Sequence, residues 1–141
     1  MPLEVRLAEL PRDEAALVEL QRVAFPYHGG LSAFKQLLRE DDLRMFVLTA
    51  DGRVVASMAV RDGDLLYYTG IMTHPDYRRQ GLAKRMMQDV MTRWHAGRSI
   101  LLSVEPDNEP AMNLYRSLGF QFTGERDGLD GRDLVMRLDS E

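Results

Sequence analysis

Residues 78–87 read RRQGLAKRMM, and this stretch joins a basic cluster around a single glycine to an apolar pattern of helical spacing. One face of the expected helix carries the apolar residues Leu82, Met86, Met87, Val90, Met91 and Trp94. A helix that begins here has N–H groups without intrahelical partners and a positive dipole end, and both features suit an anion such as phosphate. A solvated basic face would explain the charges equally well.

The composition limits what such an anion would be. The chain has 141 residues, is 45% hydrophobic and 28% charged, and carries a formal net charge of −4. Only Lys35 and Lys84 of the 18 basic residues are lysine, which leaves 16 arginines. A basic cluster in an acidic chain favours one anionic ligand at one place over nucleic acid. With no cysteine, disulfides, thiolate zinc sites and a cysteine nucleophile are excluded.

The sequence also indicates the organisation and setting of the chain. It contains no internal repeat, low-complexity tract or linker, so we expect one domain over residues 1–141. No apolar run is long enough for a membrane span. The first residues are charged and lack the apolar segment of a secretory signal. We therefore expect a cytoplasmic protein that binds neither nucleic acid nor membrane.

The first half of the chain is expected to run strand, helix, helix and then three strands. The first strand spans residues 3–8, the first helix follows Pro11 and ends near residue 24, and a short second helix spans residues 31–40. Asp51-Gly52 lies between two apolar runs, residues 45–49 and 54–60, and predicts a two-residue hairpin turn. A third strand of this meander follows over residues 65–73.

The second half alternates helices and strands. Residues 100–104 (ILLSV) are almost continuously apolar, as expected of a strand buried on both faces, and residues 108–118 form a helix with Gly119 at its C-terminal end. Two last strands span residues 120–124 and 134–138. The predicted order β-α-α-β-β-β-α-β-α-β-β gives an α/β fold with a mixed, mostly antiparallel central sheet and helices on both faces. Residues 65–104 should form a right-handed parallel crossover.

Several motifs in this order carry a resemblance to a known family. Arg78-x-x-Gly81-x-Ala83 is followed by the strand ILLSV, by Asn108 and by LYRSLGF over residues 114–120. This set strongly resembles the GCN5-related N-acetyltransferases, the GNAT family, whose recurrent turn is Gln/Arg-x-x-Gly-x-Gly/Ala. The resemblance implies the GNAT fold and transfer of an acetyl group from acetyl-CoA to a primary amine, directly within a ternary complex.

The resemblance also implies where acetyl-CoA binds. Its pyrophosphate would be held by the turn and helix start, which comprise Arg78, Arg79, Gln80, Gly81, Leu82, Ala83 and Lys84. Its pantetheine arm would pair like an extra strand with Ile71, Met72 and Thr73, where the sheet splays from residues 100–104. Asn108 would contact the arm near its thiol end, or cap the helix ahead of Glu109-Pro110, or do both.

The catalytic groups implied by the resemblance are less complete. Tyr115 matches the tyrosine that protonates the departing thiolate in many GNAT enzymes, although a tyrosine packed in the core is the simpler alternative. Several relatives have a glutamate twelve residues earlier, where this chain has Ser103. Glu105, which has the same strand parity, and His28 are the candidate bases. A base that acts through water, or no base, is an equal alternative.

The acceptor and the assembly stay open at this stage. Peptide N-termini, lysine side chains, polyamines, amino acids and aminoglycosides all fit a primary-amine acceptor. The missing glutamate also permits a different class of protein, a non-catalytic acyl-CoA-binding sensor or partner domain. The two closing strands would be able to extend a sheet in a second copy, so a homodimer is possible.

Overall fold

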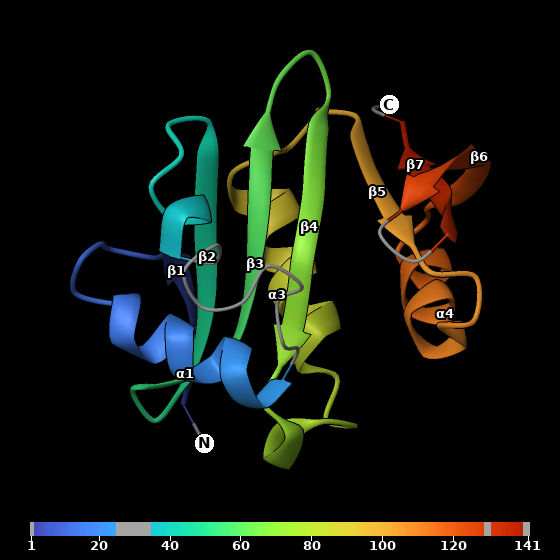
Figure 1. The fold of residues 1–141 in the computed structure, drawn as a ribbon. Coiled ribbons are helices and arrows are strands. Elements are labelled where there is room, and N and C mark those ends of the chain that lie inside the picture. Colours follow the sequence, from blue (N-terminus) through green and yellow to red (C-terminus); the bar gives the residue numbers. More distant parts are fainter. Residues whose placement is uncertain (1, 25–34, 129–130, 140–141) are drawn as a thin grey trace.

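A computed structural model describes residues 2–24, 35–128 and 131–139 of the chain (Figure 1). The elements in chain order are β1 (Leu3–Leu7), α1 (Glu14–Ala24), β2 (Leu43–Ala50), β3 (Arg53–Asp62), β4 (Leu66–Thr73), the 3-10 helix η1 (Pro75–Tyr77), α3 (Leu82–Arg93), β5 (Ile100–Val104), α4 (Glu109–Ser117), β6 (Gln121–Gly128) and β7 (Gly131–Leu138). Residues 35–37 are also helical, and residues 31–34 of the predicted second helix lie outside the described residues.

The strands form one sheet in the order β1-β2-β3-β4-β5-β7-β6. β4 and β5 are parallel, and every other neighbouring pair is antiparallel. The parallel pair needs a crossover, and α3 supplies it. The predicted mixed, mostly antiparallel sheet is therefore confirmed. The Asp51-Gly52 hairpin is also present, with positive φ at both residues (51° and 83°), as a type I′ turn requires.

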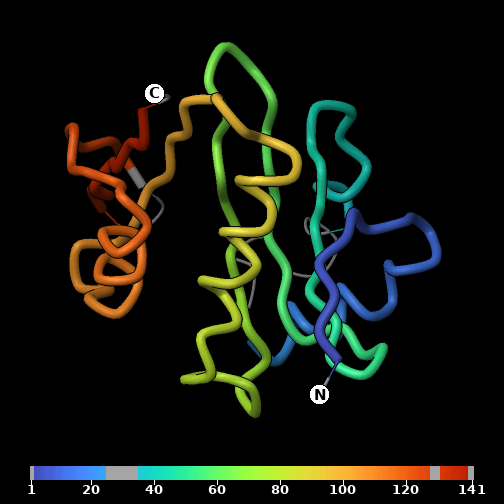
Figure 2. The backbone as a smooth tube through the Cα atoms, turned by 180° about the vertical axis from the view of Figure 1, so that it is seen from behind, coloured from blue at the N-terminus to red at the C-terminus, as the bar shows by residue number. Residues whose placement is uncertain are grey.

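Helices cover both faces of the sheet, as predicted. α1 lies on the face towards the viewer in Figure 1, and α3 and α4 lie on the opposite face, seen from the front in Figure 2. The two faces bury separate apolar clusters. The α1 face buries Leu17, Leu20, Leu38, Leu43, Met45, Val47, Ala59 and Met72. The larger cluster on the other face includes Leu82, Met86, Met87 and Val90 from α3 and Met112 and Tyr115 from α4.

Strand β5 departs from the sequence expectation, because only one of its faces is fully buried. Ile100, Leu102 and Val104 are buried against the helices α3 and α4, whereas Leu101 and Ser103 on the α1 face are only half-buried. α1 packs on β3 and β4 and leaves this part of the sheet open within the described residues. The prediction of a strand buried on both faces was therefore wrong, and one face of β5 is partly exposed.

The closing hairpin is longer than predicted. β6 continues to Gly128 instead of ending at Gly124, and β7 begins at Gly131 instead of Leu134. Cross-strand ion pairs of Arg132 with Glu125 (3.3 Å) and Asp127 (2.9 Å) hold the polar extension, which has no apolar alternation to reveal it. β6 forms one edge of the sheet, so the possible homodimer stays a prediction. In the part of the chain that is described, no helix has the length and apolar character to cross a membrane.

Candidate active site

The two parallel strands at the centre of the sheet stay together for only three residue pairs. Leu66, Tyr67 and Tyr68 of β4 pair with Ile100, Leu101 and Leu102 of β5. β4 then continues to Thr73 without further pairing to β5. Because backbone amides seek hydrogen bonds, the edge of β4 from residue 69 to 73 offers unpaired groups to an extended, amide-bearing ligand. The predicted pantetheine segment, residues 71–73, belongs to this edge.

A bulge in β4 lies at the start of this free edge. Gly70 and Ile71 together oppose the single residue Met58 of β3, and Gly70 has a φ of 59°. After the bulge, Ile71 packs with the cluster under α3, whereas Met72 packs with the cluster under α1. The extra residue therefore redirects the strand where it leaves β5, as bulges commonly do next to functional sites.

The predicted phosphate-binding turn links β4 to α3. His74 caps the short helix η1 by accepting a hydrogen bond from the Asp76 N–H at 3.1 Å. Gly81 is the N-cap of α3 in the left-handed conformation (φ 71°) and makes no side-chain cap, and Arg79 also has a positive φ of 64°. The first main-chain bond of the helix runs from the Arg85 N–H to the Gly81 carbonyl at 3.1 Å.

Consequently the N–H groups of residues 82–84 have no partner inside the helix, and they lie beside a residue without a Cβ. This arrangement fits a pyrophosphate at a helix N-terminus. The helix begins at Leu82. The Arg78 side chain is engaged elsewhere, because its Nη2 donates to the Ala24 carbonyl at the end of α1 (3.1 Å). The Arg78 N–H donates to the Pro75 carbonyl (3.5 Å), so the donors left for a ligand at this residue are the remaining N–H groups of the guanidinium.

Helix α4 begins where the sequence predicts. The Asn108 Oδ1 accepts a hydrogen bond from the Ala111 N–H at 3.3 Å, and Pro110 occupies the first turn. The capping role of Asn108 is therefore present in the structure. Its amide nitrogen is a separate donor, so the cap and the predicted ligand contact are compatible.

Tyr115 lies on the buried face of α4, with 7% of its surface exposed. Its ring packs 6.2 Å from the ring of Phe120. Burial, with a smaller electrostatic contribution from Tyr67, raises the pKa of Tyr115 to about 12. The phenol therefore keeps its proton at neutral pH, as a proton donor must. Both the predicted catalytic role and a purely structural role in the core fit this position.

The candidate bases differ in their surroundings. Glu105 follows the end of β5 and is exposed, and its carbonyl accepts from the Asn108 N–H in the following turn (3.0 Å). His28 lies outside the described residues. The Ser103 Oγ is hydrogen-bonded to the Tyr67 hydroxyl at 2.5 Å. Arg126 of β6 donates to the same hydroxyl at 3.0 Å.

Tyr67 and Arg126 are polar residues that the sequence reading missed. Tyr67 occurs in an apolar strand, next to a second tyrosine, and strand parity alone would have placed it with residues 101 and 103 on the α1 face. Arg126 gave no signal, because the predicted last-but-one strand ended before it. The alternation of side chains along β4, which places Tyr67 on the α1 face, was therefore the cue that the sequence offered for this contact.

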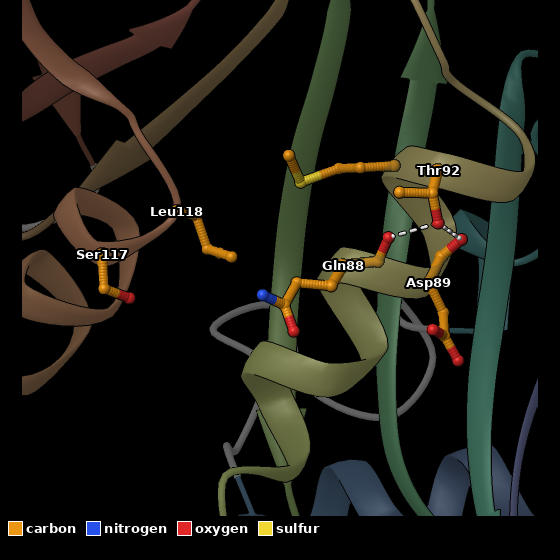
Figure 3. A pocket seen from close by; sticks show the side chains of 6 residues that line it. Gln88, Asp89, Thr92, Ser117 and Leu118 are labelled. Atoms are coloured by element: carbon orange, nitrogen blue, oxygen red, sulfur yellow. Dashed lines mark hydrogen bonds between the residues drawn. The ribbon is translucent and has the colours of Figure 1, made fainter.

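A groove of about 430 Å³ separates the two helices that follow β4 and β5 (Figure 3). Its lining is mixed and consists of Gln88, Asp89, Met91 and Thr92 from α3 with Ser117 and Leu118 at the end of α4. In α3, the Thr92 hydroxyl donates to the Gln88 carbonyl at 2.9 Å, so its hydrogen-bond donor is used within the helix. The groove is on the face that carries Tyr115, so a ligand that leaves the strand gap on this side would find it open.

Comparison with known proteins agrees with this geometry. The profile of the acetyltransferase (GNAT) family matches residues 14–120. The catalytic subunit NAA20 of the N-terminal acetyltransferase B complex from Arabidopsis thaliana is 33% identical over 82 residues, which cover 50% of this chain and 47% of the relative. An N-alpha-acetyltransferase from Sulfurisphaera tokodaii is 26% identical over 128 residues, which cover 77% of this chain and 75% of the relative.

The solved structures show the same architecture. The ribosomal-protein-S18-alanine N-acetyltransferase from Escherichia coli superposes with a TM-score of 0.81 at 24% identity, over 97% of this chain and 93% of that one. At this identity the likeness concerns the fold alone. The chain spans about half the length of NAA20 but three quarters of the Sulfurisphaera relative.

Proposed function

Because the chain belongs to the acetyltransferase (GNAT) family, we propose that it transfers the acetyl group of acetyl-CoA to a primary amine, directly within a ternary complex. The observation that carries the proposal is the parting of β4 from β5 after three residue pairs, beside an α3 N-terminus that lacks a side-chain cap. An extended amide-containing arm with a pyrophosphate at one end matches these two features together.

In this proposal the free edge of β4 pairs with the pantetheine amides, and the main chain of residues 78–84 holds the pyrophosphate. Asn108 contacts the arm near its thiol end through the amide nitrogen that the cap leaves free. Tyr115 gives its proton to the thiolate that departs from the acetyl group. Holding both substrates in one gap contributes much of the rate by proximity, to which a positioned acid adds about 10²–10⁴-fold.

The acceptor that we favour is the α-amine at the N-terminus of a protein or peptide. Support comes from the relatives, since both are named for acetylation of N-terminal or α-amines. Glu105 stays a candidate base at the exposed rim of the gap, where a carboxylate would also attract a cationic amine. The accessible α1 face of β5 gives such an acceptor a side of the sheet from which to approach.

The alternative is a non-catalytic acyl-CoA-binding domain that acts as a sensor or a partner subunit. The observation that favours it is the serine at residue 103, where a carboxylate base would be expected. Such a domain would bind CoA and acetyl-CoA at the same gap without releasing free thiol.

Thermal unfolding with acetyl-CoA, CoA or ATP, followed by a thiol-release assay over amines, separates these possibilities. The amines should include peptides with free and blocked N-termini and a free lysine side chain. A ligand at a hundred times its dissociation constant stabilises the fold by about 2.7 kcal/mol. We expect stabilisation by both CoA forms and not by ATP, with thiol release only from a peptide that has a free α-amine. Stabilisation without release would favour the binding domain, and no stabilisation would refute the CoA site.

A further inference from the structure

Three polar side chains from three strands form a continuous hydrogen-bonded chain on the sheet. The Arg126 Nη1 donates to the Tyr67 hydroxyl at 3.0 Å, and that hydroxyl lies 2.5 Å from the Ser103 Oγ. The guanidinium carbon of Arg126 also lies 5.4 Å from the centre of the Tyr67 ring. The chain thus joins β6, β4 and β5, which are far apart in the sequence but belong to one sheet (Figure 1).

These three hydrogen-bonded side chains lie near the point where β4 and β5 stop pairing. Tyr67 belongs to the middle one of the three residue pairs between β4 and β5, and Ser103 is the first residue of β5 beyond the pairing. Strand alternation places Ser103 on the α1 face, since its neighbours Leu102 and Val104 are buried on the other. Ser103 and Tyr67 are half-buried and Arg126 is exposed, so a solute can reach the site from this face.

Tyr115 belongs to the opposite face of the sheet. It packs in the cluster beneath α3 and α4. A thioester in the gap would have Tyr115 on one side, where the sulfur departs, and Ser103 on the other.

Arginine can only donate, so the Tyr67 oxygen accepts from Arg126, whereas either hydroxyl of the Tyr67–Ser103 pair can donate to the other. In both arrangements the Ser103 Oγ keeps a lone pair for a ligand. We propose that the Ser103 Oγ accepts an N–H of the acceptor amine and aims the nitrogen lone pair at the acetyl carbonyl. Tyr67 and Arg126 act through Ser103 as positioning residues.

The inference rests on the proposed function and deepens it. During the transfer the nitrogen–carbon bond forms and the carbon–sulfur bond breaks. The nitrogen loses one proton to water, the sulfur takes one from Tyr115, and water restores the Tyr115 proton. Ser103 keeps its own proton throughout, so the step needs orientation by a serine and does not need a carboxylate at this position.

A structural role predicts a different set of effects. If the three residues only held β6 against the centre of the sheet, their loss would lower the stability and disturb CoA binding to a similar extent. If they position the acceptor, their loss would act on the amine and leave CoA binding unchanged. Separate kinetic parameters for the two substrates therefore distinguish the roles.

The test uses Ser103→Ala, Tyr67→Phe, their double variant and Arg126→Gln, with an N-terminal peptide as acceptor. Arg132→Gln is the matched control, because Arg132 belongs to the same hairpin and its ion pairs among the described residues are with Glu125 and Asp127. We expect kcat/KM for the peptide to fall by about 10- to 100-fold in the first two variants, with an unchanged KM for acetyl-CoA. The double variant should lose little more than either single one, since both changes remove one contact.

Ser103→Thr keeps the hydroxyl and should retain most of the activity, which guards against an effect of strand packing alone. The proposal is overturned if Ser103→Ala and Tyr67→Phe keep the wild-type kcat/KM, if their losses multiply, or if Arg132→Gln loses as much as Arg126→Gln. A wild-type protein that releases no thiol would instead refute the proposed function, so the two failures are distinguishable.

Discussion

Burial gives Tyr115 the properties of an acid that keeps its proton over the whole working range. Its pKa is raised to about 12, so the protonated form predominates at every pH below that value. We expect Tyr115→Phe to lower kcat by about 10²-fold while the affinity for CoA stays the same. The ratio of the wild-type rate to the variant rate should stay constant from pH 6 to pH 10, because the phenol does not titrate there.

Steady-state kinetics across this pH range check the prediction, with the melting temperature and CoA titrations as controls for folding. An unchanged kcat would leave Tyr115 as a core tyrosine. A ratio that declines towards pH 10 would mean that the phenol titrates near its ordinary value, contrary to its burial in the structure.

At the scale of single residues, the sequence predicted the groups whose roles are local. Asn108 caps α4 as expected, because a cap depends only on the next three residues. The contact between Arg126 and Tyr67 joins residues 59 positions apart and was not predictable. It depends on β6 continuing past Gly124, and the polar run Glu125-Arg126-Asp127 lacks the apolar alternation that predicts a strand.

The start of α3 depends on a left-handed residue that favours glycine. Gly81 has a φ of 71°, and no atom lies within 4 Å of the Cβ that alanine would add. Gly81→Ala should therefore destabilise the fold through backbone strain alone, by about 1–2 kcal/mol. Relaxation of that strain would turn the N–H groups of residues 82–84 away from the pyrophosphate, so we also expect CoA affinity to fall by about tenfold or more.

Gly52→Ala provides a matched comparison, because Gly52 has a φ of 83° and equally open surroundings, in the β2–β3 hairpin and outside the segments proposed to bind CoA. Denaturant unfolding should show a similar loss of stability in both variants, and CoA titration should show a loss of affinity only for Gly81→Ala. Equal CoA affinities in the two variants would remove the helix start from the binding site.

The residue pair Tyr68 and His95 links the C-terminal end of α3 to β4 and should make stability depend on pH. The Tyr68 hydroxyl and the His95 Nδ1 lie 2.6 Å apart, and a bond donated by the hydroxyl uses the neutral imidazole. Burial, helped by nearby Arg98, lowers the pKa of His95. As the pH falls through about 6.5, the unfolded chain binds the proton before the folded one does, so the free energy of unfolding should decrease.

Unfolding free energies measured between pH 5.5 and pH 7.5 check this effect. His95→Gln keeps an acceptor for Tyr68 but does not titrate, so its stability should depend less on pH than that of the wild type. A wild-type slope in His95→Gln would assign the acid sensitivity to other groups.

At the scale of elements, the sequence predicted whether each segment is a helix or a strand, but it predicted bulges and exposed faces less well. The face of α3 followed from helical spacing, because Leu82, Met86, Met87 and Val90 are all buried. The bulge at Gly70 was not predictable, since it is set by the pairing of β4 with β3 and leaves no local pattern. The same holds for β5, whose open face results from where α1 packs.

For the whole molecule, the order of elements predicted the sheet, but the gap that makes the site required the register. Alternation and turns locate strands without saying where two parallel strands stop pairing. β4 and β5 separate after Tyr68 and Leu102. The structure therefore supplies the feature that the sequence did not predict, the point at which β4 and β5 separate and leave a gap for a ligand.

Within the described residues, unpaired strand edges occur both inside the sheet and at its two outer ends, and hydrogen exchange can show which of them a ligand uses as an extra strand. The inner edge is that of β4 over residues 69–73, and the outer edges are those of β1 and β6. Only the inner edge lies next to the free N–H groups of residues 82–84. Acetyl-CoA should therefore slow exchange in these two segments together and leave β1 and β6 unchanged. ATP, which lacks the pantetheine amides, should not protect residues 69–73. Protection confined to β6 would move the ligand to the outer edge, and protection of residues 82–84 alone would reduce the gap to a phosphate site.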